Sequence, residues 1–530
     1  MMHIRITIVV TLLLSLASKS TAQKTLFDES ERTIIRLQDD RRGVDTIVQY
    51  LSSPKAKVAW RAAIALANIK DTTTRKPLIA HLKKENPPSV SEAIEFALGV
   101  LGPNAEVFKA LSTFTEHGSS VELFIALGRT ATKEDIPQLA EILRKKTTPA
   151  RAAVGALIEI SMHKLLDEEL AKIVDELTGN DDPEVLWRAV YSFARCEDST
   201  LLSHHIPAIK AYLGDIGSPE TRMFAVTALG RIHNEESASV LINAARSEVE
   251  WRVRVNIFNA IAKLPRYSSA IHAVIKKAVT ESLTDSLTSN HVARAALDAL
   301  DQMIAAGKIT SPDSVSIKEW LSDYIPNREL YQDQSVLIRS QAMIPLARFG
   351  ADYEGVRDIV SFLSYHNRSV DINVWKAVGV IPDTLTFFFG INRVFATSAS
   401  DLNYLLDALH SIWELAKKDS ILFSKFETFR YASLYRHMLI RFASQTEDPA
   451  IVANTMEQIK DPVIVTDSLR SEAEEYLLQY VDRYAFPRYH DQLNAVLSAI
   501  AWLKPTNPAF GTRIEAVMNK AASEWGDGPL

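Results

Sequence analysis

The chain has 530 residues, of which 47% are hydrophobic and only 18 are glycine. That glycine share is roughly half of the ~7% that is usual. Sheet-rich folds need glycine in their hairpin turns, so the composition favours helices. The length allows three average domains or one long repeat array. The formal net charge is −6, and no long basic stripe is present. Both features argue against nucleic-acid binding, because a duplex requires a concentrated positive face.

The first 22 residues have the pattern of a secretory signal peptide. Arg5 precedes an apolar run at residues 6–17, and residues 20–22 are Ser-Thr-Ala, the small side chains that a signal peptidase recognises. The apolar run is shorter than the ~20 residues that a membrane-spanning helix needs. We therefore expect cleavage after Ala22 and a soluble product in the periplasm or outside the cell.

A single cysteine, Cys196, is present in the whole chain. An intramolecular disulfide and a cysteine-based zinc site are therefore both excluded. Cys196 follows the helical run 186–195, which predicts a small buried residue. A reactive thiol is the alternative interpretation.

One pattern recurs along the chain. A break that contains Pro, Asp, Asn or Ser is followed by an arginine and then by apolar residues at helical spacing, often with Ala-Leu. Pro54 leads to Arg61 in this way, and Pro149 leads to Arg151. From Arg151 onward the successive arginines are 37, 34, 32, 40 and 45 residues apart, which is typical of helix-turn-helix repeats. The arginines that mark the copies are Arg61, Arg151, Arg188, Arg222, Arg254, Arg294 and Arg339.

The pattern has a direct physical explanation. Each marked helix follows a second amphipathic segment. Alanines at the repeated positions allow neighbouring helices to approach closely, and Pro or Asp suits the first helical turn. We expect each arginine to reach an acidic or carbonyl group of the adjacent turn. One helix pair cannot bury its apolar face alone, so the copies stack. The sequence thus predicts an all-α fold, an α–α superhelix of roughly ten to twelve helix pairs. The second amphipathic segments include 44–51, 76–82, 136–143 and 170–177.

These units resemble HEAT repeats, and the fold expected is a HEAT/armadillo-type solenoid. The runs Arg32 to Arg42, Val48 to Leu51 and Trp60 to Ala65 also resemble the HEAT-repeat front half of exported bacterial proteins in which a cyclophilin-type prolyl isomerase domain follows. The chain ends at Trp525 to Leu530 without a counterpart of that β-barrel. No isomerase residue can therefore be assigned, and whether such a domain belongs after Leu530 stays open.

The last third of the sequence is less regular. The segments 311–327 and 380–392 are predicted to interrupt the repeat, whereas 448–459 and 489–502 resume helical patterning. We predict a HEAT-repeat solenoid over residues 23–354. Residues 355–530 are predicted to continue it as irregular helical repeats, with a separate helical domain from about residue 355 as the alternative.

Motifs that carry chemistry are missing from the sequence. There is no Gly-x-Ser-x-Gly, no Gly-x-Gly-x-x-Gly, no phosphate-binding loop and no His-Glu-x-x-His. The adjacent pair His204 and His205 is the most metal-like feature. Neighbouring helical residues point about 100° apart, so a satisfied surface pair is the preferred interpretation. We assign no catalytic residue, no cofactor and no metal.

Two sets of aromatic residues are candidates for binding. Trp60, Trp187 and Trp251 fall at the same register of their repeats. Packing between repeats is the preferred interpretation, and a ligand ladder along a groove is the alternative. Residues 385–395 contain three consecutive phenylalanines, which cannot all lie on one side of a helix. A buried junction or an exposed patch that docks a partner would explain this segment. The candidate docking residues are Phe387, Phe388, Phe389 and Phe395.

The sequence therefore predicts a non-enzymatic, exported scaffold that binds a protein partner. The partner and the oligomeric state are left open, and neither nucleic acid nor a membrane span is expected. The alternative is the non-catalytic front half of a prolyl isomerase that acts in protein folding. A weaker alternative is a pigment-lyase-like enzyme, because such arrays occur there as well. The export signal and the lack of an acidic active-site cluster argue against it.

Overall fold

The computed structural model consists of helices joined by short turns, with no strand among the residues it describes. These residues are 28–115, 120–214, 218–281, 287–325, 333–350, 358–359, 361–362, 367–381, 386–387, 390, 399–428, 430–442, 446, 448–461, 464–466, 469–484, 490–505, 510–516 and 519. None of the helices within these ranges is long and apolar enough to cross a membrane.

The chain forms two compact units. Unit 1 is Met1–Pro265 and unit 2 is Arg266–Leu530. The division falls inside the range 23–354 that the sequence predicted as one regular array. The boundary expected near residue 355 stays a prediction.

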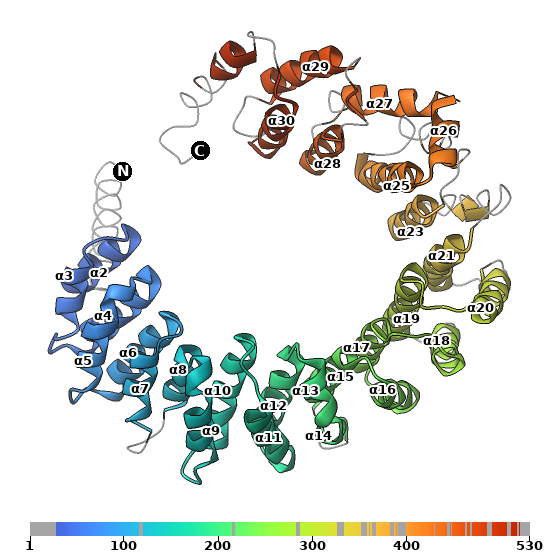
Figure 1. Ribbon diagram of the computed structural model, residues 1–530. Coiled ribbons are helices and arrows are strands. Elements are labelled where there is room, and N and C mark those ends of the chain that lie inside the picture. The colour runs from blue at the N-terminus through green and yellow to red at the C-terminus, as the bar shows by residue number, and fades with distance from the viewer. Residues whose placement is uncertain are drawn as a thin grey trace, which may run out of the picture. The chain divides into compact units, whose positions relative to one another are not determined.

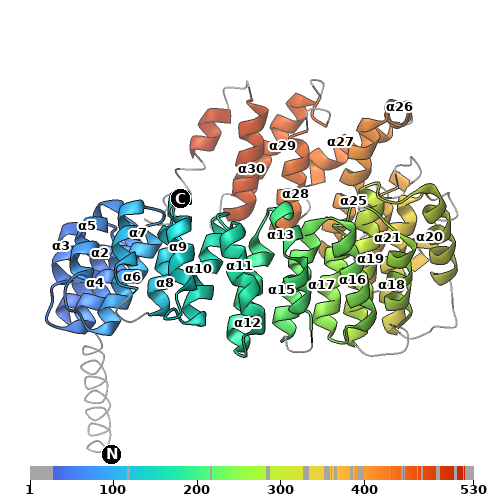
Figure 2. The same ribbon diagram turned by 60° about the horizontal axis from the view of Figure 1, so that its bottom comes forward.

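Unit 1 is built from pairs of helices (Figure 1). In Figure 2 its helices stand side by side with roughly parallel axes. The predicted second helices at 44–51, 76–82, 136–143 and 170–177 are confirmed to within two residues as α3, α5, α9 and α11. The helices of unit 1 are α2 (Glu29–Asp39), α3 (Val44–Tyr50), α4 (Ala56–Ile69), α5 (Arg75–Leu82), α6 (Pro88–Val100), α7 (Ala105–Ser112), α8 (Val121–Thr130), α9 (Ile136–Arg144), α10 (Ala150–Met162), α11 (Glu168–Glu176), α12 (Pro183–Arg195), α13 (Ser199–His204), α14 (Ile206–Ala211), α15 (Pro219–Ile232), α16 (Glu235–Ser247) and α17 (Trp251–Ile261).

One member of each pair forms a continuous layer. Helices α4, α6, α8, α10, α12, α15 and α17, called the inner helices below, pack each against the next. They lie on the inner side of the curve that unit 1 follows in Figure 1, while α5, α7, α9, α11 and α16 lie on its outer side. Almost fully buried apolar side chains come from the helices of both layers. The hydrophobic core of unit 1 therefore lies within and between the two layers.

Small residues set the close approach of the inner helices. A Cβ atom on Gly128 of α8 would lie 2.6 Å from the carbonyl oxygen of Ala156 on α10. A Cβ atom on Gly230 of α15 would lie 2.7 Å from Cβ of Ala260 on α17. The predicted role of alanine is thus confirmed at Ala156 and Ala260, and glycine lets the opposing backbone come closer still.

The helix starts follow the predicted chemistry. Pro183 and Pro219 occupy the first turns of α12 and α15, where a missing N–H costs nothing. The side chain of Asp182 accepts a hydrogen bond from the backbone N–H of Glu184, and Ser218 caps α15 through the N–H of Thr221.

Unit 2 contains a second series of packed helices. Helices α19, α21, α23, α25, α28 and α30 contact one another in that order. The predicted helices at 448–459 and 489–502 are confirmed as α28 and α30. The helices are α18 (Ser269–Glu281), α19 (Leu287–Ala305), α20 (Ser311–Tyr324), α21 (Asp333–Arg348), α23 (Arg368–Gly379), α25 (Ala399–Lys418), α26 (Ser420–Thr428), α27 (Tyr431–Phe442), α28 (Pro449–Ile459), α29 (Arg470–Arg483) and α30 (His490–Leu503).

The interruption predicted at 311–327 is wrong for most of its length. Residues Ser311 to Tyr324 form the helix α20. Pro312 lies in the first turn of that helix, where proline is tolerated, so the Ser-Pro pair begins a helix there. Most of the other predicted interruption, 380–392, lies outside the described residues.

Candidate functional site

The repeat arginines connect neighbouring repeats. Nε of Arg151 on α10 lies 2.6 Å from Oδ2 of Asp182, the N-cap of α12. Arg222 on α15 makes a two-pronged bond to Glu248, with Nε 2.8 Å and Nη2 3.2 Å from the carboxylate oxygens. The expectation that each arginine reaches an acidic group of the adjacent turn is confirmed at these two positions.

The remaining repeat arginines differ in their contacts. Nε of the buried Arg339 donates to the carbonyl oxygen of Ile325, 2.6 Å away, as the sequence predicted. Nε of Arg188 donates to Glu184 of its own helix, 2.8 Å away, so the adjacent-turn prediction is wrong there. Arg61 and Arg254 are half-buried on inner helices, and Arg294 is exposed on α19.

Each predicted tryptophan lies on an inner helix and is half-buried, beside an arginine. The guanidinium carbon of Arg61 lies 5.1 Å from the ring centroid of Trp60. The same pairing occurs at Trp187 with Arg188, at 5.2 Å, and at Trp251 with Arg252, at 5.4 Å. Cation–π contact is favourable at such distances, so the three repeats present one common motif.

Trp187 also packs between repeats, as the preferred interpretation held. Its ring centroid lies 6.0 Å from that of Phe224 on α15. Tyr191, one turn further along α12, makes an edge contact with Phe224 at 4.8 Å and carries Arg195 over its ring at 5.4 Å. Trp187 and Tyr191 are only half-buried, so this packing leaves both residues partly exposed.

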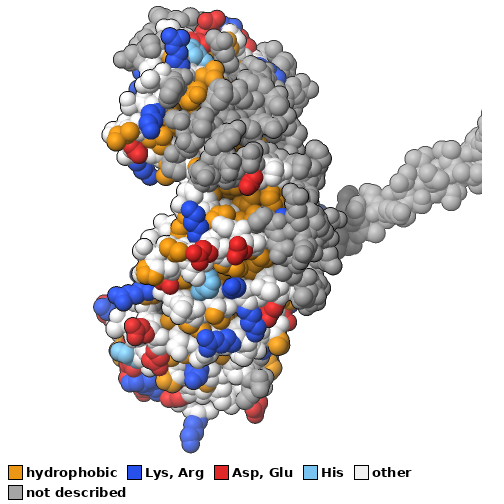
Figure 3. Space-filling view, turned by 90° about the vertical axis from the view of Figure 1, so that its right-hand side faces the viewer, with side chains coloured by type: hydrophobic (Ala, Val, Ile, Leu, Met, Phe, Trp, Pro, Cys, Tyr) orange, Lys and Arg blue, Asp and Glu red, His pale blue; other side chains and the backbone are white. Residues whose placement is uncertain are grey.

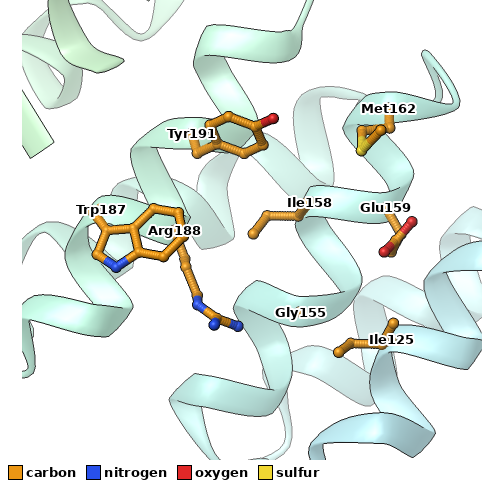
Figure 4. Close-up of a pocket in the computed structure, with 8 residues that line it drawn as sticks. All are labelled: Ile125, Gly155, Ile158, Glu159, Met162, Trp187, Arg188 and Tyr191. Carbon is orange, nitrogen blue, oxygen red and sulfur yellow. The ribbon is translucent and has the colours of Figure 1, made fainter. Parts of the chain in front are cut away.

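A cavity of about 400 Å³ opens beside these rings, between α8, α10 and α12. In Figure 4 the Trp187 and Tyr191 side chains come from α12, and Ile158 lies between them and Ile125. The cavity is mainly apolar, with Glu159 and Arg188 as its charged residues. Its lining residues are Ile125, Gly155, Ile158, Glu159, Met162, Trp187, Arg188 and Tyr191.

Gly155 helps to shape this cavity. A Cβ atom there would lie 2.9 Å from Cγ1 of Ile125, so a larger residue would push the Ile125 side chain aside. Met162 at the end of α10 is 51% exposed. A long, flexible side chain of this kind adapts to varied apolar partners.

Glu159 of the cavity lining has further acidic side chains as neighbours. Nη2 of Arg129 on α8 lies 2.9 Å from Oε1 of Glu159, and its Nη1 lies 3.9 Å from Oε1 of Glu122. The Ser120 hydroxyl donates to Oε2 of the buried Glu95 at 2.6 Å. Burial raises the pKa of Glu95, and the neighbouring charges of Glu92 and Glu122 add to this effect. Burial likewise raises the pKa of Glu122, which Arg129 opposes.

On the side of the molecule drawn in Figure 3, acidic and basic side chains of the described residues are interspersed.

The histidine pair differs from its prediction. His205 is only 3% exposed, and its Nδ1 lies 2.7 Å from Oδ2 of Asp175. Its ring stacks on Phe193 at 5.4 Å. His204 is exposed, with Nδ1 3.5 Å from Oε2 of Glu168. The satisfied surface pair is therefore wrong for His205, because the turn between α13 and α14 directs its ring into the core. Within the described residues no group of His, Cys, Asp or Glu could hold a metal ion.

Cys196 is buried, as predicted, at the end of α12. Burial raises the pKa of its thiol, which lowers the fraction of reactive thiolate.

Of the four phenylalanines predicted to dock a partner, the structure describes only Phe387. Phe387 is fully buried in unit 2, with its ring stacked on Phe426 at 4.6 Å and on Trp413 at 6.2 Å. A docking role for Phe387 is therefore wrong, because its ring fills an aromatic core. Phe388, Phe389 and Phe395 lie outside the described residues, and their docking role stays a prediction.

The comparisons with known proteins agree with this architecture. A model of HEAT repeats matches residues 32–99 and 170–262. The chain carries HEAT repeats. No curated protein matches the sequence.

Solved structures with the same fold are large HEAT-repeat solenoids. Importin beta, in an ammonium sulfate condition, has a TM-score of 0.53 at 11% identity, over 95% of this chain and 71% of that one. Kap95p bound to RanGDP has a TM-score of 0.53 at 13% identity, over 91% and 69%. Kap121p bound to Pho4p has a TM-score of 0.52 at 12% identity, over 96% and 64%. At such low identity these similarities establish the fold alone, an all-α superhelix of HEAT type.

Sequence reasoning found the tryptophans but missed the cavity beside one of them. Two signals were available. Gly155 stands inside a strongly helical run, where glycine costs about 1 kcal/mol relative to alanine. In addition, Ala-Leu-Gly-Arg occurs at both 126–129 and 228–231, which marks Arg129 as a repeat position.

Proposed function

We propose that this protein is an exported, non-enzymatic scaffold that binds a protein partner on the inner helices of unit 1. The cavity between α8, α10 and α12 carries this proposal, because half-buried aromatic residues and a methionine line it on a layer of packed helices. Tryptophan, tyrosine, methionine and arginine are the residues that protein interfaces favour.

Two further observations support protein binding. Solenoids offer extended surfaces for large or extended partners. Two of the similar solved structures, Kap95p with RanGDP and Kap121p with Pho4p, are complexes with other proteins.

Site-specific photo-crosslinking tests the binding face. p-Benzoylphenylalanine is placed in cells at Met162, which lines the cavity on the inner helix α10, and, as a matched control, at Lys172 on the outer helix α11. Both side chains are about half exposed. We expect a discrete protein adduct from position 162 and none from position 172. Adducts from position 172 alone would place binding on the outer layer.

Export rests on the pattern of residues 1–22 and needs its own test. Cell fractionation followed by N-terminal sequencing should recover, outside the cytoplasm, a chain that starts at Gln23. An intact Met1 in the cytoplasmic fraction would contradict export.

A second candidate is the non-catalytic front half of a prolyl isomerase, favoured by the resemblance of residues 31–65. The mass of the native protein separates the candidates, because an isomerase domain would add substantially to the 59.1 kDa of this chain.

A further inference from the structure

Glu159 of the cavity lining and its acidic neighbours belong to three successive inner helices. Glu92 and Glu95 lie on α6, Glu122 on α8 and Glu159 on α10. Arg129 contacts Glu122 and Glu159, whereas the buried Glu95 accepts a hydrogen bond from the neutral Ser120 hydroxyl. Two of the four carboxylates thus contact the Arg129 guanidinium, and Glu95 is bonded to a neutral group instead.

The crowding of these carboxylates has an electrostatic consequence. Glu92 and Glu122 both raise the pKa of Glu95, and Glu92 and Glu159 raise that of Glu122. Glu95 and Glu122 therefore lie in the negative potential of neighbouring carboxylates. A cation placed among these carboxylates would offset their electrostatic repulsion, since partly buried charges interact more strongly than fully solvated ones.

Two arginines lie on the opposite side of the cavity. Arg188 and Arg195 lie on α12, stacked on Trp187 and Tyr191 respectively. Arg188 is paired with Glu184 of the same helix at 2.8 Å, so the α12 side carries both signs of charge, whereas carboxylates predominate on the α6–α8 side. This polarity distinguishes one orientation of a bound chain from the other.

We propose that the inner face of unit 1 takes an extended protein segment in which a lysine or arginine lies about three residues from a bulky apolar residue. The apolar side chain fills the cavity between α8, α10 and α12, and the cation lies beside Glu92 and Glu122. This proposal rests on the proposed function. The spacing follows from neighbouring helix axes at about 8–10 Å and an extended rise of about 3.3 Å per residue.

Peptide titration of the mature full-length protein tests the chemistry of the segment. The probes are three capped peptides that contain Lys-Ser-Ser-Phe, Glu-Ser-Ser-Phe or Lys-Ser-Ser-Ser. Binding is followed by the ¹³C-methyl resonance of Met162, which lines the cavity. We expect saturable shifts with the Lys-Ser-Ser-Phe peptide and affinities at least tenfold weaker for the other two, a difference of about 1.4 kcal/mol.

Variants of the protein locate the two parts of the site. Glu92→Gln combined with Glu122→Gln should abolish the preference for lysine over glutamate while the Met162 resonance still responds to phenylalanine. Glu169→Gln on the outer helix α11, whose side chain is 51% exposed, serves as the matched control and should change nothing. Circular-dichroism melting confirms that each variant is folded.

The outcomes separate this proposal from the proposed function. Equal affinity for the lysine and glutamate peptides, or no Met162 shift with any peptide, would overturn the proposal. If position 162 nevertheless forms crosslinks to a protein, the binding face stands and only the segment chemistry is wrong. If crosslinks are missing as well, both are wrong.

Discussion

The same repeat position produces ion pairs of very different burial. Arg222 and Glu248 are 16% and 10% exposed, whereas Arg151 is 63% exposed beside Asp182. Removing one partner of a largely buried pair leaves the other charge poorly solvated, while exposed pairs contribute little.

We expect Arg222→Met to lower the free energy of unfolding by about 2–3 kcal/mol. Arg151→Met, the matched control, should cost less than about 1 kcal/mol. Urea denaturation followed by circular dichroism measures both, and methionine keeps most of the aliphatic stem. Equal losses for the two variants would show that burial does not govern the repeat arginine.

We expect the buried Glu95 to make the free energy of unfolding depend on pH. Its pKa is raised by burial, so the folded protein holds this proton more tightly than the unfolded chain does. Stability linked to Glu95 is therefore highest at acid pH and falls as pH rises from the unfolded pKa through the folded pKa. Glu95→Gln should raise the urea midpoint at pH 7, and its advantage should shrink as pH falls toward 4. A lower midpoint at pH 7 would contradict the assigned cause.

Phe387 belongs to the core of unit 2, together with Trp413, Phe426 and Tyr435. We expect Phe387→Ala to cost about 3–5 kcal/mol through lost burial and a residual cavity. Ile421→Ala, in the same unit but at a side chain 71% exposed, should change stability by less than about 0.5 kcal/mol. Thermal and urea unfolding measure both, and a neutral Phe387→Ala would return this residue to the candidates for docking.

At the scale of the helix, close packing of small residues fixes the spacing of the inner layer. Gly128→Ala would place Cβ 2.6 Å from the Ala156 carbonyl oxygen and 2.9 Å from Cβ of Glu159. We expect a net loss of about 1–3 kcal/mol in the free energy of unfolding, despite the better helix propensity of alanine.

Gly179→Ala is the matched control, because an added Cβ there meets nothing within 4 Å. This variant should lie within about 0.5 kcal/mol of the wild type in the same unfolding assay. A stabilised Gly128→Ala would show that α8 and α10 can separate without cost.

The sequence predicted the helices well because their signals are local. Apolar spacing, capping side chains and proline in the first turn define α9, α11 and α12 from nearby residues alone. The Ser-Pro pair at 311–312 was misinterpreted because proline both ends helices and begins them. Whether a proline ends one helix or begins the next depends on the segment that follows the proline.

The candidate site was less predictable because it depends on neighbouring repeats. Trp187 was identified by its register, but the cavity requires Gly155 from one helix and Ile125 from another. The partner of each arginine also depends on where the adjacent turn ends. Arg222 meets Glu248 at the end of α16, whereas Arg188 pairs within its own helix.

At the scale of the whole molecule, each HEAT repeat contacts chiefly its neighbours, so stability accumulates from local interfaces. The function of such a solenoid then depends on which face of its helical layers a partner can contact. In unit 1 the inner helices combine half-buried aromatic rings with a polarised cavity.

Hydroxyl-radical footprinting of the protein in complex with its crosslinked partner tests this account most directly. Methionine, tryptophan and tyrosine side chains report their own solvent access through oxidation. We expect Met162, Trp187 and Tyr191 to become protected in the complex, while the half-buried Tyr50 on the outer helix α3 keeps its rate. Protection of Tyr50 with unchanged oxidation at Met162, Trp187 and Tyr191 would contradict binding on the inner helices of unit 1.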